Sequence, residues 1–213
     1  TYTLMTNTGS RAGTGSFVLS PAYVNASLVT NASSLKLVVV DTGAYGLKWK
    51  GDVSENWDGT DLNWTNGSDA VVFAPGDAVA FDDAASRFTV ASLSASPVLP
   101  GAVLFNNSIS NYAVSASIDG TGVVYKLGSG MVTLSGSNAY TGQTTIVSGT
   151  LTIGGSGVLG AGNYATNLIN NGALNYASSA AQTNSGVISG GGSLTASGTG
   201  TLTLSGNNTY GGL

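Results

Sequence analysis

Hydrophobic residues along this chain alternate with polar residues over short runs, and the runs are bounded by Gly or Asn. The clearest runs are Leu35–Val38, Ala78–Phe81, Phe88–Val90, Val123–Tyr125, Val132–Leu134, Thr150–Ile153 and Leu202–Leu204. Alternation with a period of two predicts strands with one buried face. No helical period is found, and the Gly residues between the runs supply the positive φ angles that tight turns need. The pattern therefore predicts an all-β protein.

An internal repeat favours one all-β architecture. Residues 118–142 align with residues 188–212 at an offset of 70, with identical residues at 12 of the 25 positions. Such repeats are typical of solenoids, in which each unit buries its apolar face only against its neighbours. An offset of 70 would correspond to about three coils of roughly 20–25 residues. We expect a parallel β-helix or β-solenoid, with a β-sandwich as the alternative.

The composition fits an ordered chain with little charge. Gly, Ser, Thr and Asn make up nearly half of the 213 residues, but 42% of the residues are hydrophobic and the net charge is only −4. Disordered chains combine low hydrophobicity with high net charge, so disorder is not expected. Lys126 is the last charged residue, and the following 87 residues carry no charge. A solenoid would favour such a stretch, because like charges stacked every ~4.8 Å repel one another.

The residues that are missing exclude several function classes. The chain contains no His and no Cys. It therefore has no His general base, no thiol nucleophile, no disulfide and no His or Cys metal ligand. Six scattered basic residues cannot neutralise a nucleic-acid backbone. Apolar runs such as Leu37–Val40 are far shorter than the roughly 18 residues of a membrane helix.

The first copy of the repeat carries a long motif. It reads Gly128-Ser129-Gly130-Met131-Val132-Thr133-Leu134-Ser135-Gly136-Ser137-Asn138-Ala139-Tyr140-Thr141-Gly142-Gln143-Thr144-Thr145-Ile146, followed by Gly149-Thr150-Leu151. This motif closely resembles the autotransporter-associated β-strand repeat of bacterial secreted and surface proteins. The second copy matches from Gly198 to Gly212 and lacks the second half of the motif. The resemblance implies an extracellular, right-handed parallel β-helix that acts as a stalk, adhesin or matrix component without catalysis of its own.

Charge and resemblance together divide the chain into three segments. Residues 1–47 are rich in predicted strands and are similar to the close of a preceding repeat block. Residues 48–100 form an acidic β segment that contains Trp and is similar to a segment that precedes such repeats. Residues 101–213 are the Gly-rich solenoid repeats.

Both ends of the chain resemble unfinished coils. The chain is therefore either a piece of a longer protein or a subunit whose missing strand comes from a neighbour. Exposed sheet edges pair readily, and strand addition between subunits builds a head-to-tail filament. We hypothesise that Thr1-Tyr2-Thr3-Leu4 of one copy completes the coil left open after Tyr210 and Leu213 of another, so that the main partner is the chain itself.

The acidic residues permit two functional interpretations, as calcium ligands or as catalytic groups, and one purely structural interpretation. Loop carboxylates bind Ca²⁺ in many secreted β proteins, but the spacing here matches neither an EF-hand nor a calcium-binding nonapeptide. Asp82, Asp83 and Arg87 form the one cluster suited to the acid–base cleavage of a polysaccharide, and no second constellation accompanies it. We interpret the acids as solvated loop residues, with Ca²⁺ as the alternative ligand, no other cofactor and no enzymatic activity.

The aromatic residues also have two interpretations. Trp49, Trp57 and Trp64 recur every seven or eight residues. Exposed indole faces would stack on sugar rings, whereas buried ones would form a core. Tyr140 and Tyr210, which are equivalent in the repeat, are interpreted as packing residues.

The sequence thus predicts a structural β-solenoid module at the bacterial cell surface or outside the cell, self-associating into a filament or homo-oligomer. The alternative is an adhesin module that binds glycans or a surface through Trp49, Trp57, Trp64, Asp82 and Asp83. A polysaccharide-active enzyme is the third reading.

Overall fold

The computed structural model describes residues 2–6, 26–30, 34–39, 46–92 and 96–212. Contacts divide the chain into two units, Thr1–Ala44 and Tyr45–Leu213, and each unit is described by itself. The limit expected near residue 100 lies inside the second unit.

The first unit contains a small antiparallel sheet. Its strands are β1 (Tyr2–Thr6), β2 (Ala26–Thr30) and β3 (Ser34–Val39), in the order β1-β3-β2. β1 pairs with β3 from Tyr2 opposite Leu37 to Thr6 opposite Ser34, with one irregularity along the way. The run predicted at residues 35–38 is a strand. Its antiparallel pairing differs from that of a parallel solenoid, however, so the solenoid prediction applies to the second unit.

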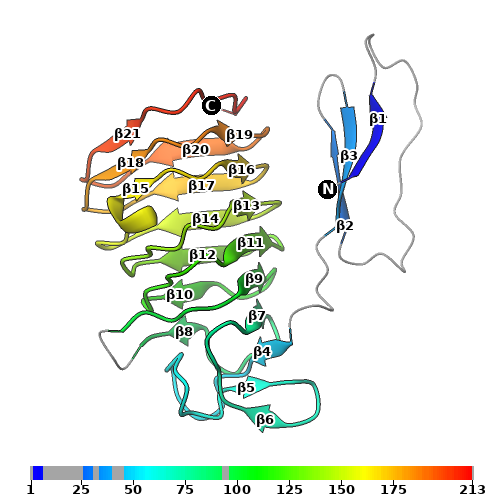
Figure 1. Ribbon diagram of the computed structural model, residues 1–213, viewed down its shortest axis with the longest axis vertical. Coiled ribbons are helices and arrows are strands. Elements are labelled where there is room, and N and C mark those ends of the chain that lie inside the picture. The colour runs from blue at the N-terminus through cyan, green and yellow to red at the C-terminus, as the bar shows by residue number, and fades with distance from the viewer. Residues whose placement is uncertain (1, 7–25, 31–33, 40–45, 93–95, 213) are drawn as a thin grey trace. The chain divides into compact units, whose positions relative to one another are not determined.

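The second unit is a parallel β-solenoid whose coils stack along one axis (Figure 1). From edge to edge, its largest sheet contains β19 (Ile188–Ser189), β16 (Leu168–Asn170), β13 (Thr144–Ile146), β11 (Val123–Leu127), β9 (Ala102–Asn106), β7 (Ala78–Asp82), β4 (Leu47–Trp49), β5 (Trp64–Thr65) and β6 (Ala70–Val71). The second sheet contains β20 (Ser193–Ala196), β17 (Ala173–Tyr176), β14 (Thr150–Ile153), β12 (Met131–Leu134), β10 (Tyr112–Val114) and β8 (Thr89–Val90). The third contains β15 (Asn163–Tyr164), β18 (Gln182–Asn184) and β21 (Leu202–Leu204).

The prediction of a β-solenoid is confirmed for the second unit, whose described residues do not form the alternative β-sandwich. In the described residues the only helical segment is one 3₁₀ turn, η3 (Gly160–Gly162). The right hand implied for the coil stays a prediction. Six of the seven runs of alternating residues lie wholly in strands, and in the run Phe88–Val90 the strand β8 begins at Thr89. The strands that the alternation did not predict include short polar ones such as Gln182–Asn184 and also the apolar β9, in which Val103, Leu104 and Phe105 are all buried and so do not alternate.

The length of a coil follows from the strand pairing. Val124 pairs with Val103 in the coil below, and Thr144 pairs with Val124, so these coils take 20 or 21 residues. Leu168 pairs with Thr144, so the coil that contains η3 takes 24. The 70-residue offset is therefore longer than three coils.

The two copies of the repeat consequently lie on different faces of the solenoid. Met131–Leu134 of the first copy is β12 in the second sheet, whereas the equivalent Leu202–Leu204 is β21 in the third sheet. The interval of 70 residues was expected to span three coils. It spans three coils and continues to the next face of the solenoid.

What the two copies share is their contact with the coil below. The Asn138 side-chain oxygen accepts the N–H of Ile118 at 3.2 Å, and the equivalent Asn208 oxygen accepts the N–H of Ile188 at 2.8 Å. Both bonds join residues 20 positions apart. The repeat thus specifies how a coil lies on its neighbour and leaves open which face it occupies.

Glycine lies where the backbone of one coil meets the backbone of the next. A Cβ atom added to Gly142 would lie 2.0 Å from the carbonyl oxygen of Gly122, and one added to the equivalent Gly212 would lie 2.3 Å from that of Gly192. No side chain fits there, so these repeat positions require Gly for space.

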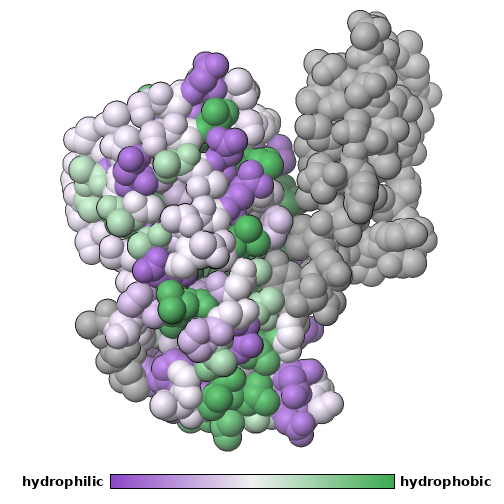
Figure 2. Space-filling model, in the orientation of Figure 1, coloured by the Kyte–Doolittle hydropathy of each residue, from purple (hydrophilic) through white to green (hydrophobic). Residues whose placement is uncertain are grey.

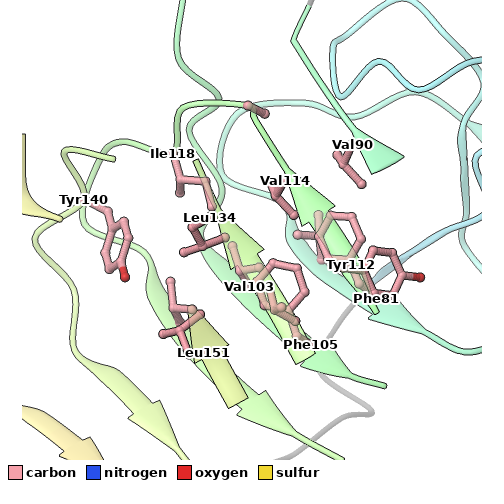
Figure 3. Close-up of a cluster of buried hydrophobic side chains, with 14 of the residues drawn as sticks. Phe81, Val90, Val103, Phe105, Tyr112, Val114, Ile118, Leu134, Tyr140 and Leu151 are labelled. Carbon is pink, nitrogen blue, oxygen red and sulfur yellow. The ribbon is translucent and has the colours of Figure 1, made fainter. Parts of the chain in front are cut away.

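The interior changes in character along the axis. One column of inward-facing residues runs across the largest sheet in the order Phe81, Phe105, Lys126, Ile146 and Asn170. All five are completely buried. Figure 3 shows the earlier coils, where aromatic and aliphatic side chains from neighbouring strands pack together. The later coils bury more amide and hydroxyl groups.

Gly142→Ala should destabilise the protein because its methyl group would overlap a carbonyl of the coil below. Overpacking of this kind costs about 1–3 kcal/mol. Gly191→Ala is the matched control, since nothing lies within 4 Å of its added Cβ, and its effect should stay within about 0.5 kcal/mol. Urea unfolding followed by Trp fluorescence measures both. Equal stabilities of the two variants would contradict the close-approach argument.

Candidate functional site

An aromatic cluster closes the end of the solenoid at which β4 lies. β5 and β6 pair antiparallel beyond β4, so the parallel stacking ends there. Trp49, Trp57 and Trp64 are each completely buried in this cluster. The ring centroids of Trp49 and Trp64 lie 5.1 Å apart, and those of Trp57 and Phe81 lie 5.2 Å apart. Edge-to-face contacts of this kind stabilise aromatic cores.

The three Trp side chains thus lie where the core interpretation expects them. Trp49 donates its indole N–H to the Arg87 carbonyl at 2.9 Å, whereas the N–H groups of Trp57 and Trp64 have no partner. Their faces contact other rings. In this arrangement no indole face is exposed for stacking on a sugar ring.

A small cavity of about 240 Å³ lies beside Trp57. Its apolar wall includes Phe73, Pro75, Pro97 and Leu99. Asp58, Ser92 and Ser96 also line it.

The acidic residues of this region hold turns. Asp58 accepts hydrogen bonds from the N–H groups of Thr60 and Asp61 at 2.8 and 2.9 Å. Burial alone would raise the pKa of the Asp58 carboxyl, but these bonds outweigh it and lower the pKa. Asp61 accepts bonds from Ser54 and Asn56. No group of three or more Asp or Glu residues suited to a metal ion is found in the described part of the chain, and calcium binding stays the untested alternative.

Asp82, Asp83 and Arg87, which were predicted to form a cluster, each contact a different partner. Asp82 forms an ion pair with Lys48 at 3.6 Å. The Arg87 guanidinium donates to the carbonyl of Gly51. Asp83 instead faces the loop of the next coil.

The Asp83 carboxylate organises that loop. It accepts the backbone N–H groups of Ser108, Ile109 and Ser110 at 2.8, 3.1 and 2.9 Å. Burial alone would raise the pKa of Asp83, but the three N–H groups outweigh it, and the nearby Lys126 charge acts in the same direction, so the pKa is lowered. The side chain thus holds a coil corner.

Lys126 is a site residue that sequence reasoning missed. It is completely buried, and its Nζ donates to the carbonyls of Leu127 and, at 2.9 Å, Gly128. Burial lowers its pKa to about 8, and the attraction of Asp83 offsets only part of that effect. The alternation carried the signal, because Lys126 occupies the same inward phase as Val124.

Hydroxyl groups form a chain inside the later coils. Tyr140 Oη lies 2.8 Å from Thr144 Oγ1, which lies 2.8 Å from Tyr164 Oη. Tyr164 donates to the Gly142 carbonyl at 2.6 Å. Because that carbonyl only accepts, Thr144 donates to Tyr164 and Tyr140 donates to Thr144. Tyr140 is buried, as its interpretation as a packing residue expects.

The predicted self-association residues lie in different parts of the chain. Tyr2, Thr3 and Leu4 belong to β1 in the first unit, whereas Tyr210 packs partly buried against the solenoid core. Thr1 and Leu213 lie outside the described residues. Among the described residues, β19, β20 and β21 each pair with one strand only.

The surface of the later coils is nearly neutral. Figure 2 shows their visible face as mostly pale, because Gly, Ser and Thr have hydropathies near zero. None of the described segments is a helix of the length and hydrophobicity that a membrane crossing requires.

Comparison with known families agrees with the repeat. A family model described as passenger-associated-transport-repeat matches residues 124–153 and 194–213. These stretches contain the two motif copies, so the resemblance to the autotransporter-associated repeat is confirmed. Comparisons with curated proteins and with solved structures gave no match.

Lys126 should make stability depend on pH in the alkaline range. Its pKa is about 8 in the folded chain and 10.5 in the unfolded one, so the unfolded chain binds more protons between these values. The free energy of unfolding should rise with pH across that window. The slope is on the order of 1.36 kcal/mol per pH unit, so the total rise is a few kcal/mol at most. Above pH ~10 the free energy of unfolding should fall, because burial raises the pKa of Tyr164 to about 12.

Lys126→Met is the matched variant, since it keeps the length of the side chain and removes the amine. Urea unfolding over this pH range should show no rise for the variant. A rise that persists in Lys126→Met would show that other groups cause it.

Proposed function

Because two stretches of this chain carry the passenger-associated-transport repeat on a β-solenoid, we propose that the chain is a structural module of a bacterial surface or extracellular fibre. The repeat and the fold fit a module of the autotransporter-passenger type. The observation that supports the proposal most is that the polar and charged side chains form structural hydrogen bonds. Asp83, Lys126, Asn138 and Thr144 all hold backbone or one another inside or between coils. The module then works through its length and surface.

We further propose that copies of the module associate end to end. The two ends of the solenoid differ in a way that bears on this. At the β4 end, antiparallel strands and buried Trp residues cover the stack. At the other end, β20 and β21 have one partner each among the described residues, and their side chains are only partly covered. The edge beyond β19 is already occupied, because the N–H groups of Thr209 and Gly211 donate to the carbonyls of Ile188 and Gly190. Parallel strands with unpaired N–H and C=O groups readily accept a further strand.

The strand that is added would come from the first unit of a second copy. At the β4 end the largest sheet closes with the antiparallel strands β5 and β6, whereas β1 is the outer strand of its own sheet. Such an association joins unlike surfaces, so it does not close and produces a filament.

Negative-stain electron microscopy of the purified chain tests this association. We expect filaments from the full chain and none after deletion of residues 1–10. Thr203→Lys should also abolish them, because Thr203 is an exposed residue of β21 and a Lys there protects a strand edge from pairing.

Thr121→Lys is the matched control. It adds the same charge at an exposed turn of an inner coil, away from the open strands, and filaments should persist. Long filaments from the deletion variant or from Thr203→Lys would overturn end-to-end strand addition while leaving the structural-module proposal intact.

A further inference from the structure

The chain contains two Asn-Gly dipeptides, Asn66-Gly67 and Asn171-Gly172. In this dipeptide the backbone nitrogen of Gly can attack the side-chain amide carbon of Asn. Gly favours the reaction because it has no Cβ to hinder the approach and because its backbone turns freely. The structure gives the two dipeptides very different surroundings.

Asn66-Gly67 lies at the exposed tip of the hairpin between β5 and β6. The Asn66 side-chain oxygen accepts the N–H groups of Ser68 and Asp69 at 3.0 and 2.9 Å. When a nucleophile adds to the amide carbon, negative charge develops on this oxygen, and the two N–H groups stabilise it as an oxyanion hole does. The Gly67 N–H donates to the Thr65 hydroxyl at 3.0 Å, and nothing lies within 4 Å of the position of a Gly67 Cβ.

Asn171-Gly172 is fixed between two coils. The Asn171 N–H donates to the Ile146 carbonyl at 2.8 Å, and the Gly172 N–H donates to the Asn170 side chain at 3.2 Å. A Cβ on Gly172 would lie 2.5 Å from the Gly149 carbonyl oxygen, so the backbone there has no room to rotate. The Asn171 side-chain oxygen has one N–H partner, from Gly191 at 3.3 Å.

We infer that Asn66 is a self-modification site of the folded protein and that Asn171 is protected. The Gly67 nitrogen loses its proton to solvent base and forms a bond to the Asn66 amide carbon. The C–N bond of the amide breaks and ammonia leaves, taking up a proton, so that a cyclic imide remains. Water then opens the imide at either carbonyl and gives aspartate or isoaspartate at position 66. No oxidant, metal or enzyme is needed.

The modification would act on the cap of the solenoid. The hairpin is the outer edge of the largest sheet, with Thr65 opposite Ala70 and Trp64 opposite Val71. Isoaspartate lengthens the backbone by one carbon at the turn, which disturbs the register beside the buried Trp64. Aspartate adds a charge next to Asp69 but keeps an acceptor for the same two N–H groups. Conversion therefore changes the stability of the cap with the age of the protein.

Mass spectrometry of the full chain aged in mildly alkaline buffer tests the inference. Trypsin cleaves after Lys50, Arg87 and Lys126, which separates residues 51–87 from residues 127–213. In the folded chain, Asn66 should convert at least ~10-fold faster than Asn171, because Asn171 reacts only after local opening. In urea the two sites should convert at similar rates.

Two variants sharpen the result. Asn66→Gln keeps the amide but would require a six-membered ring, so residues 51–87 should lose the fast conversion. Asn171→Gln should leave conversion at position 66 unchanged. The inference is overturned if Asn171 converts as fast as Asn66 in the folded chain. It is also overturned if, in the folded chain, Asn66 is protected relative to urea and stays unchanged while Asn171 reacts.

Discussion

The fold depends on direct contact between the backbones of successive coils. At Gly142 and Gly212 the chain lies so close to a carbonyl of the coil below that a methyl group would overlap it. This contact fixes the spacing at which parallel strands can pair, and the pairing in turn fixes which residues face the interior. The high Gly content is thus a consequence of stacking. Side-chain amides such as those of Asn138 and Asn208 add a second tie between the same pair of coils.

Stacking at this spacing gives each interior position a neighbour directly above and below it. Aromatic rings fill the column near β4, where Phe81 and Phe105 stack with centroids 4.9 Å apart. Lys126 follows in the same column, and its amine bonds to the corner carbonyls of Leu127 and Gly128. Further along, Thr144 joins two Tyr hydroxyls. The interior is therefore held by packing at one end and increasingly by hydrogen bonds towards the other, so stability should not be uniform along the axis.

The sequence predicted the fold class and seven of the strands because both leave local signals. Alternation marks strands such as Val132–Leu134, and the paired motif marks a solenoid. The antiparallel sheet of the first unit left no such signal, because a single strand has the same alternation in either pairing. The interval of 70 residues did not reveal the change of face, since coil length depends on insertions such as the one at η3. The structural roles of Asp83 and Lys126 were not predicted, because a charged residue is expected to be solvated unless its bonding partners in the folded chain are known.

The displacement of the two repeat copies onto different faces has a geometric consequence for anything attached to them. In a solenoid whose repeats keep phase with the coil, equivalent residues form a straight file along one side. Here Leu134 and Leu204, although equivalent in the motif, lie in different sheets. Equivalent outward positions therefore point in different directions around the solenoid axis. A fibre assembled in this way would present the same local surface in several directions, and its length would not be restricted to whole numbers of coils per repeat.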